Sequence, residues 1–197
     1  MHAVPDVRLL TPADVPAASV ALARAFEDDP VMSWLYPGPV RMERFFGGFE
    51  LKLHVPNGAV YTTDDVAGAA IWAPPNKWRT SGLDLLRVAP GLLRITGSRL
   101  VRALGTMRAI EGKHPKEPHY YLAVLGTDPK HQGRGVGGAL MAPVLERCDR
   151  EGTPAFLESS KESNIPFYKR FGFEVTGEIQ LPKGPKVWPM WRDPQPA

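Results

Sequence analysis

Cysteine and long apolar segments are both scarce in this sequence. Its 197 residues include one cysteine, Cys148, which excludes an internal disulfide and favours a reducing compartment, most simply the cytoplasm. No stretch approaches the ~18 consecutive apolar residues of a membrane-spanning helix. The opening residues place Pro and Asp where a secretory signal needs an apolar run. We therefore expect a soluble chain that does not associate with membranes.

Strong charge, repeats and low-complexity tracts are missing as well. The net charge is only +3, which is too small to indicate nucleic-acid binding by itself and does not repel an anionic ligand. Hydrophobic residues make up 43% of the chain and charged residues 23%, and the 19 glycines and 21 prolines are dispersed rather than gathered in a linker. We expect one globular domain over residues 1–197, as a monomer or a homodimer.

Metal-site and nucleophile motifs are absent too. The histidines show no paired spacing with Cys or Asp that would form a metal site; they are His2, His54, His114, His119 and His131. No G-x-S-x-G segment presents a serine nucleophile. Cys148 falls on the apolar face of a predicted helix, where burial is its usual role. We expect no metal and no cysteine nucleophile.

The spacing of apolar residues predicts a mixture of helices and strands. In the first half it predicts a strand at 7–10, a helix that follows the N-cap Thr11 and breaks at Asp29-Pro30, short helices through residue 54, and a hairpin of strands 59–63 and 68–73. Two amphipathic helices between residues 83 and 110 should break near Pro90 and Gly97. We interpret the arginines among them as a solvated face.

The second half predicts a regular succession of elements. These are a strand at 119–126, a helix at 135–150 that Pro143 should kink, a strand at 154–158, a short helix at 164–172 and closing strands at 173–181 and 186–191. A strand, loop, helix and strand in succession indicate adjacent parallel strands joined by a right-handed crossover. The predicted fold class is α/β with a mixed sheet.

Residues 131–138, HQGRGVGG, satisfy two glycine motifs at once. Gly133, Gly135 and Gly138 fit the G-x-G-x-x-G of a dinucleotide-binding turn, whereas Gln132 begins the Q-x-x-G-x-G of an acetyl-CoA loop. A preceding strand, a following helix and Glu158 about twenty residues later support the dinucleotide interpretation.

The junction between strand and loop favours acetyl-CoA. In a dinucleotide turn the first glycine follows the strand directly, but here TDPKHQ intervenes. Only residues 159–197 follow Glu158, and a doubly wound fold needs several more strand and helix units. No Gly-Lys-Ser/Thr closes a P-loop. A loop that wraps a pyrophosphate needs free N–H groups leading into a helix N-terminus, which these glycines allow, and Lys130 and Arg134 add positive charge. A glycine turn that binds nothing is the remaining alternative.

With these motifs the sequence resembles the GCN5-related N-acetyltransferases, the GNAT family. Q-x-x-G-x-G after a strand matches the family's CoA loop, and FYKRFGF at 167–173 resembles its second CoA segment. Six segments have counterparts in the same order in antibiotic acetyltransferases of the puromycin N-acetyltransferase type: VRLLTPADVP, KEP, DPKHQGRGVG, PAFLESS, NIPFYKRFGF and the closing residues through VWPMW. The resemblance covers most of the chain and is weak between about residues 34 and 109, where the family usually shapes its acceptor pocket.

The resemblance implies a central mixed sheet with a V-shaped splay between two parallel strands, where acetyl-CoA is held. It assigns cofactor binding to Leu125, Gly126, Thr127, Gln132, Gly133, Arg134, Gly135, Val136, Gly137, Gly138 and Asn164. Free backbone groups of the splayed strand would bond the pantetheine. The amide near Leu125 would face the developing oxyanion.

Tyr168 matches the family's tyrosine that protonates the departing thiolate. A phenol pKa near 10 lies above a thiol pKa near 8.5, so the hydroxyl is in its donating form at neutral pH. Its alternative role is a core aromatic residue. Phe167 and Phe171 lie four residues apart on one helix face, which leaves Tyr168 on another.

Glu158 is the preferred general base. It ends the apolar run PAFL, so it would be buried unless a ligand, water or polar network receives it. A structural hydrogen bond to a neighbouring loop is the alternative. Asp28, Asp29, His119 and Tyr120 are weaker candidates.

From this resemblance we expect an acetyl-CoA-dependent N-acetyltransferase that acetylates a primary amine of a small molecule by direct transfer in a ternary complex. A puromycin-like aminonucleoside is the leading acceptor, which would connect the protein to antibiotic resistance. The alternatives are another amine, such as a polyamine, an amino acid or a protein N-terminus, or a CoA-sensing module without turnover. Neither nucleic acid nor a membrane is expected as a partner.

Overall fold

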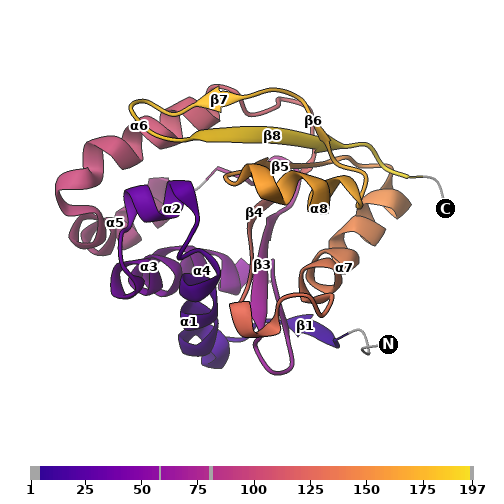
Figure 1. Ribbon diagram of the computed structural model, residues 1–197, viewed down its shortest axis with the longest axis horizontal. Coiled ribbons are helices and arrows are strands. Elements are labelled where there is room, and N and C mark those ends of the chain that lie inside the picture. Colours follow the sequence, from indigo (N-terminus) through magenta and orange to yellow (C-terminus); the bar gives the residue numbers. More distant parts are fainter. Residues whose placement is uncertain (1–4, 58, 80–81, 196–197) are drawn as a thin grey trace.

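The computed structural model describes residues 5–57, 59–79 and 82–195, which form one open sheet with helices on both faces. The strands are β1 (Val7–Leu9), β2 (Val60–Thr63), β3 (Gly68–Ala73), β4 (Tyr120–Thr127), β5 (Ala155–Ser159), β6 (Glu174–Val175), β7 (Ile179–Gln180) and β8 (Lys186–Arg192). The helices are α1 (Val15–Ala25), α2 (Pro30–Leu35), α3 (Pro39–Phe45), α4 (Leu51–His54), α5 (Gly82–Thr96), α6 (Leu100–Glu111), α7 (Val136–Glu151) and α8 (Ile165–Lys169). Figure 1 shows α1, α3 and α4 on one side of β3 and β4 and α7 on the other.

The sheet is mixed because β4 and β5 run parallel while the other pairs are antiparallel. The strand order is β1-β2-β3-β4-β5-β8-β6, and β7 pairs with β8. The parallel pair is joined through α7, which covers one face of β3 and β4. This confirms the predicted α/β fold class, the hairpin at 59–73 and the parallel pair in the second half.

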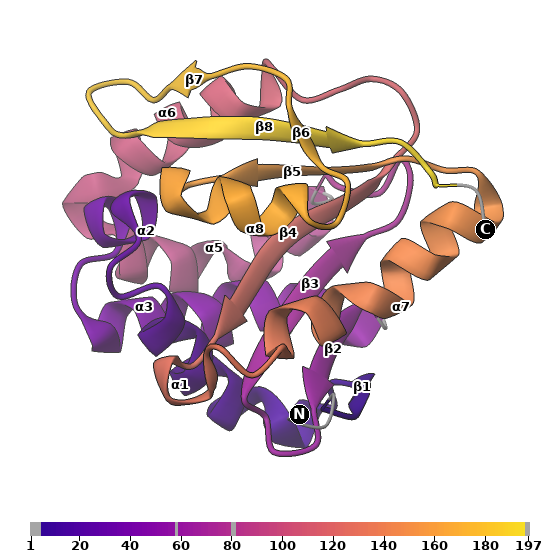
Figure 2. The same cartoon turned by 45° about the vertical axis from the view of Figure 1, so that its right-hand side comes forward.

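The parallel pair separates after a short contact. Its register joins Tyr120 to Ala155, Tyr121 to Phe156 and Leu122 to Leu157, while β5 continues to pair with β8 as far as Ser159. Figure 2 shows β4 diverging from β5 beyond this contact. The carboxyl end of β4 therefore has backbone groups that face away from β3 without a strand beside them, as a V-shaped splay requires.

A β-bulge changes the direction of β4 near the point where β4 separates from β5. Ile71 pairs with Val124 and Trp72 with Leu122, so Ala123 is the extra residue. A bulge bends a strand and increases its twist. Side chains on both sides of the irregularity remain buried, with Leu122 packed in the core around α7 and Val124 in the core around α1.

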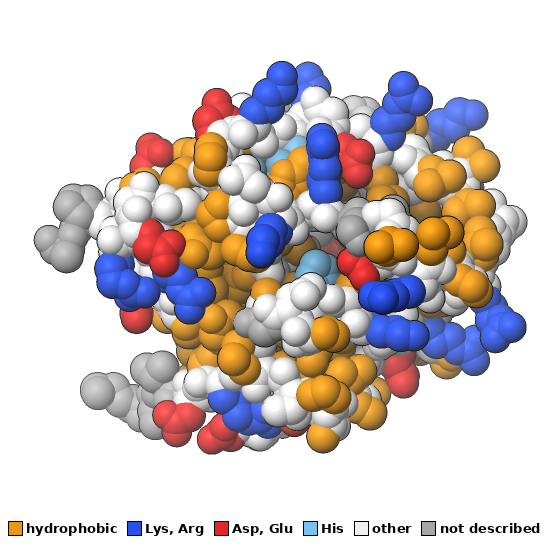
Figure 3. Space-filling model, turned by 180° about the vertical axis from the view of Figure 1, so that it is seen from behind, with side chains coloured by type: hydrophobic (Ala, Val, Ile, Leu, Met, Phe, Trp, Pro, Cys, Tyr) orange, Lys and Arg blue, Asp and Glu red, His pale blue; other side chains and the backbone are white. Residues whose placement is uncertain are grey.

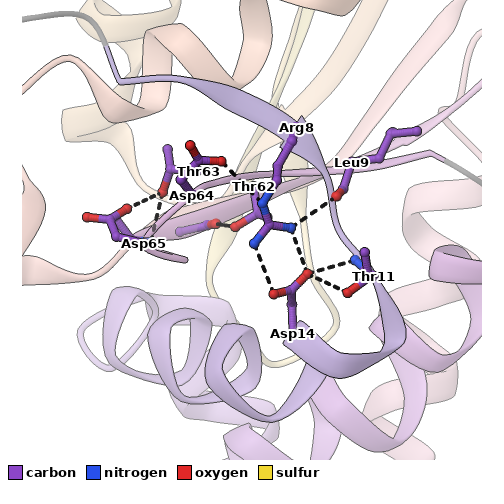
Figure 4. A network of polar contacts seen from close by, with 10 residues as sticks. Arg8, Leu9, Thr11, Asp14, Thr62, Thr63, Asp64 and Asp65 are labelled. Atoms are coloured by element: carbon purple, nitrogen blue, oxygen red, sulfur yellow. Dashed lines mark hydrogen bonds and ion pairs between the residues drawn. The ribbon is translucent and has the colours of Figure 1, made fainter.

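The opening strand and helix are held together by a carboxyl group. Asp14 accepts hydrogen bonds from the Thr11 amide at 2.9 Å and the Thr11 hydroxyl at 2.8 Å, and it binds the Arg8 guanidinium at 2.7 and 3.0 Å (Figure 4). The hydrogen bond from Arg8, followed by those from Thr11, lowers the pKa of Asp14. The predicted helix start is present, and its first turn is a 3-10 helix over Pro12–Asp14.

Two segments differ from the predicted elements. Residues 173–181 were expected as one strand, but they form the two-residue strands β6 and β7, separated by residues 176–178. The helix after Pro39 contains a π-helical turn, Phe46–Glu50, between α3 and α4. Such turns are rare and occur often at functional sites. This one places Glu50 beside β4, as described below.

The helices α5 and α6 carry a mixed surface of apolar and basic side chains. Figure 3 shows hydrophobic and Lys or Arg side chains interspersed over this side of the molecule. Leu83, Leu86 and Val101 are 72%, 72% and 80% exposed. The predicted break near Gly97 is present as a 3-10 turn, Gly97–Arg99, between α5 and α6. The predicted break near Pro90 is wrong, because Pro90 lies inside α5. No helix within the described ranges is long and apolar enough to cross a membrane.

Candidate active site

The glycine loop leads into α7, the longest helix among the described residues. Asp128 caps the turn by accepting the Lys130 amide at 3.0 Å, and the Arg24 guanidinium binds its other oxygen at 3.0 Å. Gly133 and Gly135 have φ of +75° and +82°, which favour glycine, and Gly135 is the N-cap of α7. A Cβ atom at either position would meet nothing within 4 Å, so the space in front of the loop is open.

The other two glycines of the motif are required by helix packing. A Cβ atom on Gly137 would lie 3.1 Å from the Phe167 ring, and one on Gly138 would lie 2.8 Å from the Phe171 ring. These two rings, 5.1 Å apart, form the face of the α8 segment that packs on the first turn of α7. The glycines therefore let the two predicted CoA segments approach each other, in addition to opening the loop.

The splayed end of β4 directs backbone amides toward this loop. The Tyr120 amide donates to Pro154 on the β5 side, and the Asp128 amide donates to Ala67 on the β3 side. Amides alternate along a strand, so counting back from Asp128 places the N–H groups of Thr127 and Leu125 on the side of the splay. Both residues belong to the set predicted to bind the cofactor.

These elements enclose a cleft of about 520 Å³. Helices from both faces of the sheet contribute to it, because Ala25 and Phe26 come from the end of α1, while Val136 and Tyr168 come from α7 and α8. Ten of the predicted cofactor residues line the cleft: Leu125, Gly126, Thr127, Gln132, Gly133, Gly135, Val136, Gly137, Gly138 and Asn164. Arg134 is exposed and lies outside this lining.

Tyr168 lies in the wall of the cleft and is 8% exposed. Its ring packs against Phe167 at 5.2 Å and Phe173 at 6.2 Å. Burial, together with the charge of Asp29, raises the pKa of Tyr168 above its ordinary value. The hydroxyl is therefore protonated over the physiological range, as a proton donor must be.

The mouth of the cleft is tied together by two carboxylates. Asp29 caps α2 through the amides of Val31 and Met32 at 3.0 and 2.9 Å, and it accepts the Ser160 hydroxyl. Asp28 binds the Lys161 ammonium. Asp29 thus has structural partners, and both pairs fix the α1–α2 connection against the segment after β5.

Glu158 occupies the first position of β5 beyond its pairing with β4, and its side chain is 5% exposed. It does not line the cleft described above. Instead, its Oε1 atom lies 3.4 Å from Nδ1 of His114, whose Nε2 is 3.0 Å from Nε2 of His119. Burial first, then the charge of Glu158 and a hydrogen bond to it, raise the pKa of Tyr121 well above its ordinary value.

A second buried carboxyl lies on the same side of β4. Glu50 ends the π-helical turn, 3.7 Å from the His54 ring, and burial raises its pKa to about 7. Its charge contributes to the raised pKa values of both Tyr36 and Tyr121. The charges of Glu50 and Glu158 therefore both act on the Tyr121 phenol.

The weaker candidates for a base are placed elsewhere or are already engaged. The Tyr120 hydroxyl donates to Glu151 at 2.8 Å, at the opposite end of β4 from the cleft.

Cys148 is fully buried, and burial raises the pKa of its thiol to about 12. Within the part of the chain that the structure describes, no group of three His, Cys, Asp or Glu side chains is arranged to hold a metal ion.

Sequence reasoning did not find His114, Tyr121 or Glu50 as parts of this site. Each comes from a different segment, and no local spacing connects them. His119 was considered as a base, but its partnership with His114 depends on the loop that joins α6 to β4. The apolar character of PAFL did identify Glu158 as a buried polar position.

A mixed sheet that splays at its parallel pair, with a glycine loop and a helix N-terminus at the opening, is the architecture of an acetyltransferase. The chain belongs to the acetyltransferase (GNAT) family, whose model matches residues 22–173. It is an N-acetyltransferase of the GNAT type, and that family normally uses acetyl-CoA.

Similar proteins support this assignment. An uncharacterized N-acetyltransferase of Schizosaccharomyces pombe is 29% identical over 203 residues, which cover 92% of this chain and 81% of the relative. A mycothiol acetyltransferase of Brachybacterium faecium is 35% identical over 94 residues, covering 46% of this chain and 28% of the relative.

Solved structures show the same fold. A Corynebacterium glutamicum structure, described as histone acetyltransferase HPA2 and related acetyltransferase, has a TM-score of 0.72 and 26% identity, and covers 100% of this chain and 99% of its own. The Drosophila melanogaster polyamine N-acetyltransferase, which forms N-acetylagmatine, has a TM-score of 0.65 at 17% identity, covering 95% of this chain and 99% of its own. At that identity the likeness concerns the fold alone.

Proposed function

We propose that the protein transfers the acetyl group of acetyl-CoA directly to a primary amine of a small molecule. The observation that carries the proposal is the convergence, at one cleft, of the splayed end of β4, the glycine loop and Tyr168. Acetyl-CoA supplies an acetyl thioester together with a pyrophosphate. The remaining chemistry belongs to the residues of the chain.

The cleft fits this cosubstrate. Gly133 and Gly135 leave open space before their backbone, and the N-terminus of α7 stabilises negative charge there. The Leu125 and Thr127 amides would bond the pantetheine arm, and the Leu125 amide would stabilise the developing oxyanion. Asn164, on the facing segment, lines the same cleft. Gln132, whose side chain donates to the Thr127 carbonyl at 3.2 Å, would hold the loop against β4.

The two faces of the splay would then hold different reactants. Tyr168 stands on the α7 side, where it would donate its proton to the departing sulfur. Glu158 stands on the opposite side with Tyr121, where it would take a proton from the acceptor amine. Because Cys148 is buried and its thiol pKa is raised, an acetyl-cysteine intermediate is not part of the proposal.

A puromycin-like aminonucleoside is the first acceptor to test. The motif order described above supports it, and the aromatic side chains near Glu158, including Tyr121 and Trp78, suit an acceptor with planar rings. Structural neighbours of low identity include enzymes for other small amines, so a polyamine and an amino acid belong in the same panel.

Initial rates of free-thiol release test this function. Acetyl-CoA would be varied against each amine, with puromycin, a polyamine, an amino acid and a peptide amine as acceptors. Direct transfer predicts intersecting double-reciprocal lines and acetylation of the amine. Parallel lines would refute direct transfer. Tight binding of acetyl-CoA with no thiol release for any amine would indicate a sensing module instead.

A further inference from the structure

A row of hydrogen-bonding groups lies behind Glu158, and the reaction proposed above does not use it. The Nδ1 atom of His119 is 2.6 Å from the Glu117 carbonyl oxygen, and its Nε2 is 3.0 Å from Nε2 of His114. The Nδ1 atom of His114 faces Oε1 of Glu158 at 3.4 Å. His114 and His119 are 8% and 2% exposed. The inference drawn from this row rests on the proposed acetyl transfer.

The partners of each nitrogen determine where the protons are. A carbonyl oxygen only accepts, so Nδ1 of His119 carries a proton. When His119 is neutral its Nε2 is a bare acceptor, and the proton between the two Nε2 atoms belongs to His114. A proton must then also lie between His114 and Glu158, because a bare imidazole lone pair and a carboxylate oxygen would repel each other.

The number of protons held by Glu158, His114 and His119 is the same in the second possible arrangement, in which His119 is charged. If His119 is the charged ring, it donates to Nε2 of His114, and His114 donates to Glu158. In either case the three groups hold one proton more than two neutral imidazoles and a carboxylate would. Among the described residues neither His114 Nδ1 nor Glu158 Oε1 has a hydrogen-bond partner; the two buried atoms face each other at 3.4 Å, and a proton between them would satisfy both.

The surroundings place this extra proton on His114. Its ring is stacked on Trp78 with centroids 3.7 Å apart, and the Tyr121 and Phe156 rings stand nearly perpendicular to it at 4.9 and 5.0 Å. Aromatic rings attract cations.

The remaining charged groups near the row agree with this arrangement. Burial, the largest influence, lowers the pKa of His119. Arg79 lies over the Trp78 ring at 4.8 Å, separated from the imidazole by that ring. Glu50 acts on Tyr121 from the helical side of the site.

We propose that Glu158, His114 and His119 act as one proton-accepting unit for the acceptor amine, in which the two histidines are positioning residues. His119 fixes the orientation of the His114 protons, and the proton stored on His114 keeps Glu158 a carboxylate despite its burial. Glu158 is the member of the unit that takes the proton of the amine.

The proton balance of the step follows from these roles. The amine nitrogen forms a bond to the acetyl carbon while the carbon–sulfur bond breaks. The amine loses one proton to Glu158, and the thiolate gains one from Tyr168. After the amide and CoA leave, the proton on Glu158 and the one missing from Tyr168 are exchanged with solvent, so the chain returns to its starting state.

Long-range nitrogen-15 NMR of the histidine rings tests the stored proton without any substrate. At about pH 7 the wild type should show both ring nitrogens of His114 protonated and only Nδ1 of His119 protonated. In Glu158→Gln the amide can donate to His114, so His114 should become neutral with its proton on Nε2. In His119→Phe the acceptor is lost, and His114 should become neutral with its proton on Nδ1. A neutral His114 in the wild type would overturn the unit, whatever the activity.

The pH profile of kcat/KM for the amine tests the role. Without the stored positive charge the carboxylate binds a proton more readily, so His119→Phe should move the acid limb to higher pH and lower the rate at neutral pH by roughly 10-fold or more. His119→Gln keeps a hydrogen-bond acceptor for His114, so the acid limb of its kcat/KM profile should lie at the same pH as in the wild type. A loss that is equal at every pH would show a structural role and overturn the inference.

The proposed function fails independently of this inference. Suppose that the wild type releases no thiol with any amine, while NMR shows both ring nitrogens of His114 protonated. Acetyl transfer and the catalytic role of the unit are then refuted, although the proton stored on His114 is confirmed. If the wild type is active and the His119→Phe profile is unchanged, only the role of the histidines is refuted.

Discussion

Replacing Tyr168 with Phe removes one buried hydroxyl and little else. The ring contacts with Phe167 and Phe173 are kept, so the free energy of unfolding should change by about 1 kcal/mol or less. The glycine loop and the β4 amides are untouched, so acetyl-CoA affinity should stay within about twofold. Turnover should fall by roughly 10²-fold, because a positioned acid is lost from the leaving sulfur.

A 10²-fold fall in the turnover of Tyr168→Phe corresponds to about 2.7 kcal/mol of lost transition-state stabilisation. It should appear equally in kcat and kcat/KM, since the interaction is made only in the transition state. Single-turnover measurements would separate chemistry from product release, which otherwise hides part of the loss. Since burial raises the pKa of Tyr168, wild-type activity should not decline below about pH 10 through loss of this proton.

Tyr120→Phe is the matched control. It deletes a hydroxyl from the start of β4, where the group donates to Glu151 at 2.8 Å and lies away from the cleft. Its turnover should equal that of the wild type. A folded Tyr168→Phe variant with turnover within about threefold of the parent would refute the assignment, because a lost general acid costs far more. Tyr168 would then be a packing residue, and water would protonate the thiolate.

Three further substitutions test other parts of the account. Gly135→Asp should abolish acetyl-CoA binding in calorimetry, because it places a side chain and a negative charge at a φ of +82° where the pyrophosphate approaches. Gly138→Val should destabilise the fold by about 1–3 kcal/mol in urea, since its Cβ would lie 2.8 Å from the Phe171 ring, and Phe171→Leu should restore part of this loss. Asp149→Asn should cost about 2 kcal/mol at neutral pH by leaving the Arg192 guanidinium, bound at 2.7 and 2.8 Å, without its partner.

Each of these has a control and a contradicting result. Gly177→Asp adds the same charge where a Cβ meets nothing within 4 Å, and it should leave CoA affinity unchanged; equal affinity in folded Gly135→Asp would remove the cofactor role of the loop. A Gly138→Val variant as stable as the parent would show that the ring moves freely. The hydrogen bond from Arg192 lowers the pKa of Asp149, so its contribution is present above about pH 4 and lost as the pH falls through the lowered value. The Asn variant should therefore approach the wild type in acid, and a pH-independent difference would contradict the ion pair.

The features that could be predicted are those encoded by residues close in sequence. Asp64 and Asp65 between two apolar runs predicted the hairpin, and Gln132 to Gly138 predicted a loop that enters a helix N-terminus. The crossover from β4 through α7 to β5 followed from the order of the elements. In each case the physical signal, a turn, a cap or a periodicity, spans only a few residues.

The features that could not be predicted depend on distant segments. The bulge at Ala123 is set by the register of β3, and the π-helical turn before Glu50 has no turn residue that marks it. Residues 173–181 alternate as a strand would, but this part of the sheet pairs them with β8 at two separate places. His114 lies between α6 and β4 and meets Glu158 of β5 across a long sequence separation, so no local pattern connects them.

The catalytic roles of Tyr168 and Glu158 remain predictions that the geometry supports to different degrees. Tyr168 lines the cleft together with the glycine loop. Glu158 lies at the splay but faces the histidine row on the other side of the sheet. The two residues therefore serve one reaction only if the thioester lies in the opening between β4 and β5.

Mass spectrometry of the acceptor after incubation with the protein and acetyl-CoA tests the central claim most directly. The account predicts that puromycin or another small primary amine gains one acetyl group on nitrogen, in an amount equal to the CoA released, and that no acetyl group remains on the protein. Acetyl-CoA that binds the folded protein and leaves every amine of the panel unmodified would contradict the account.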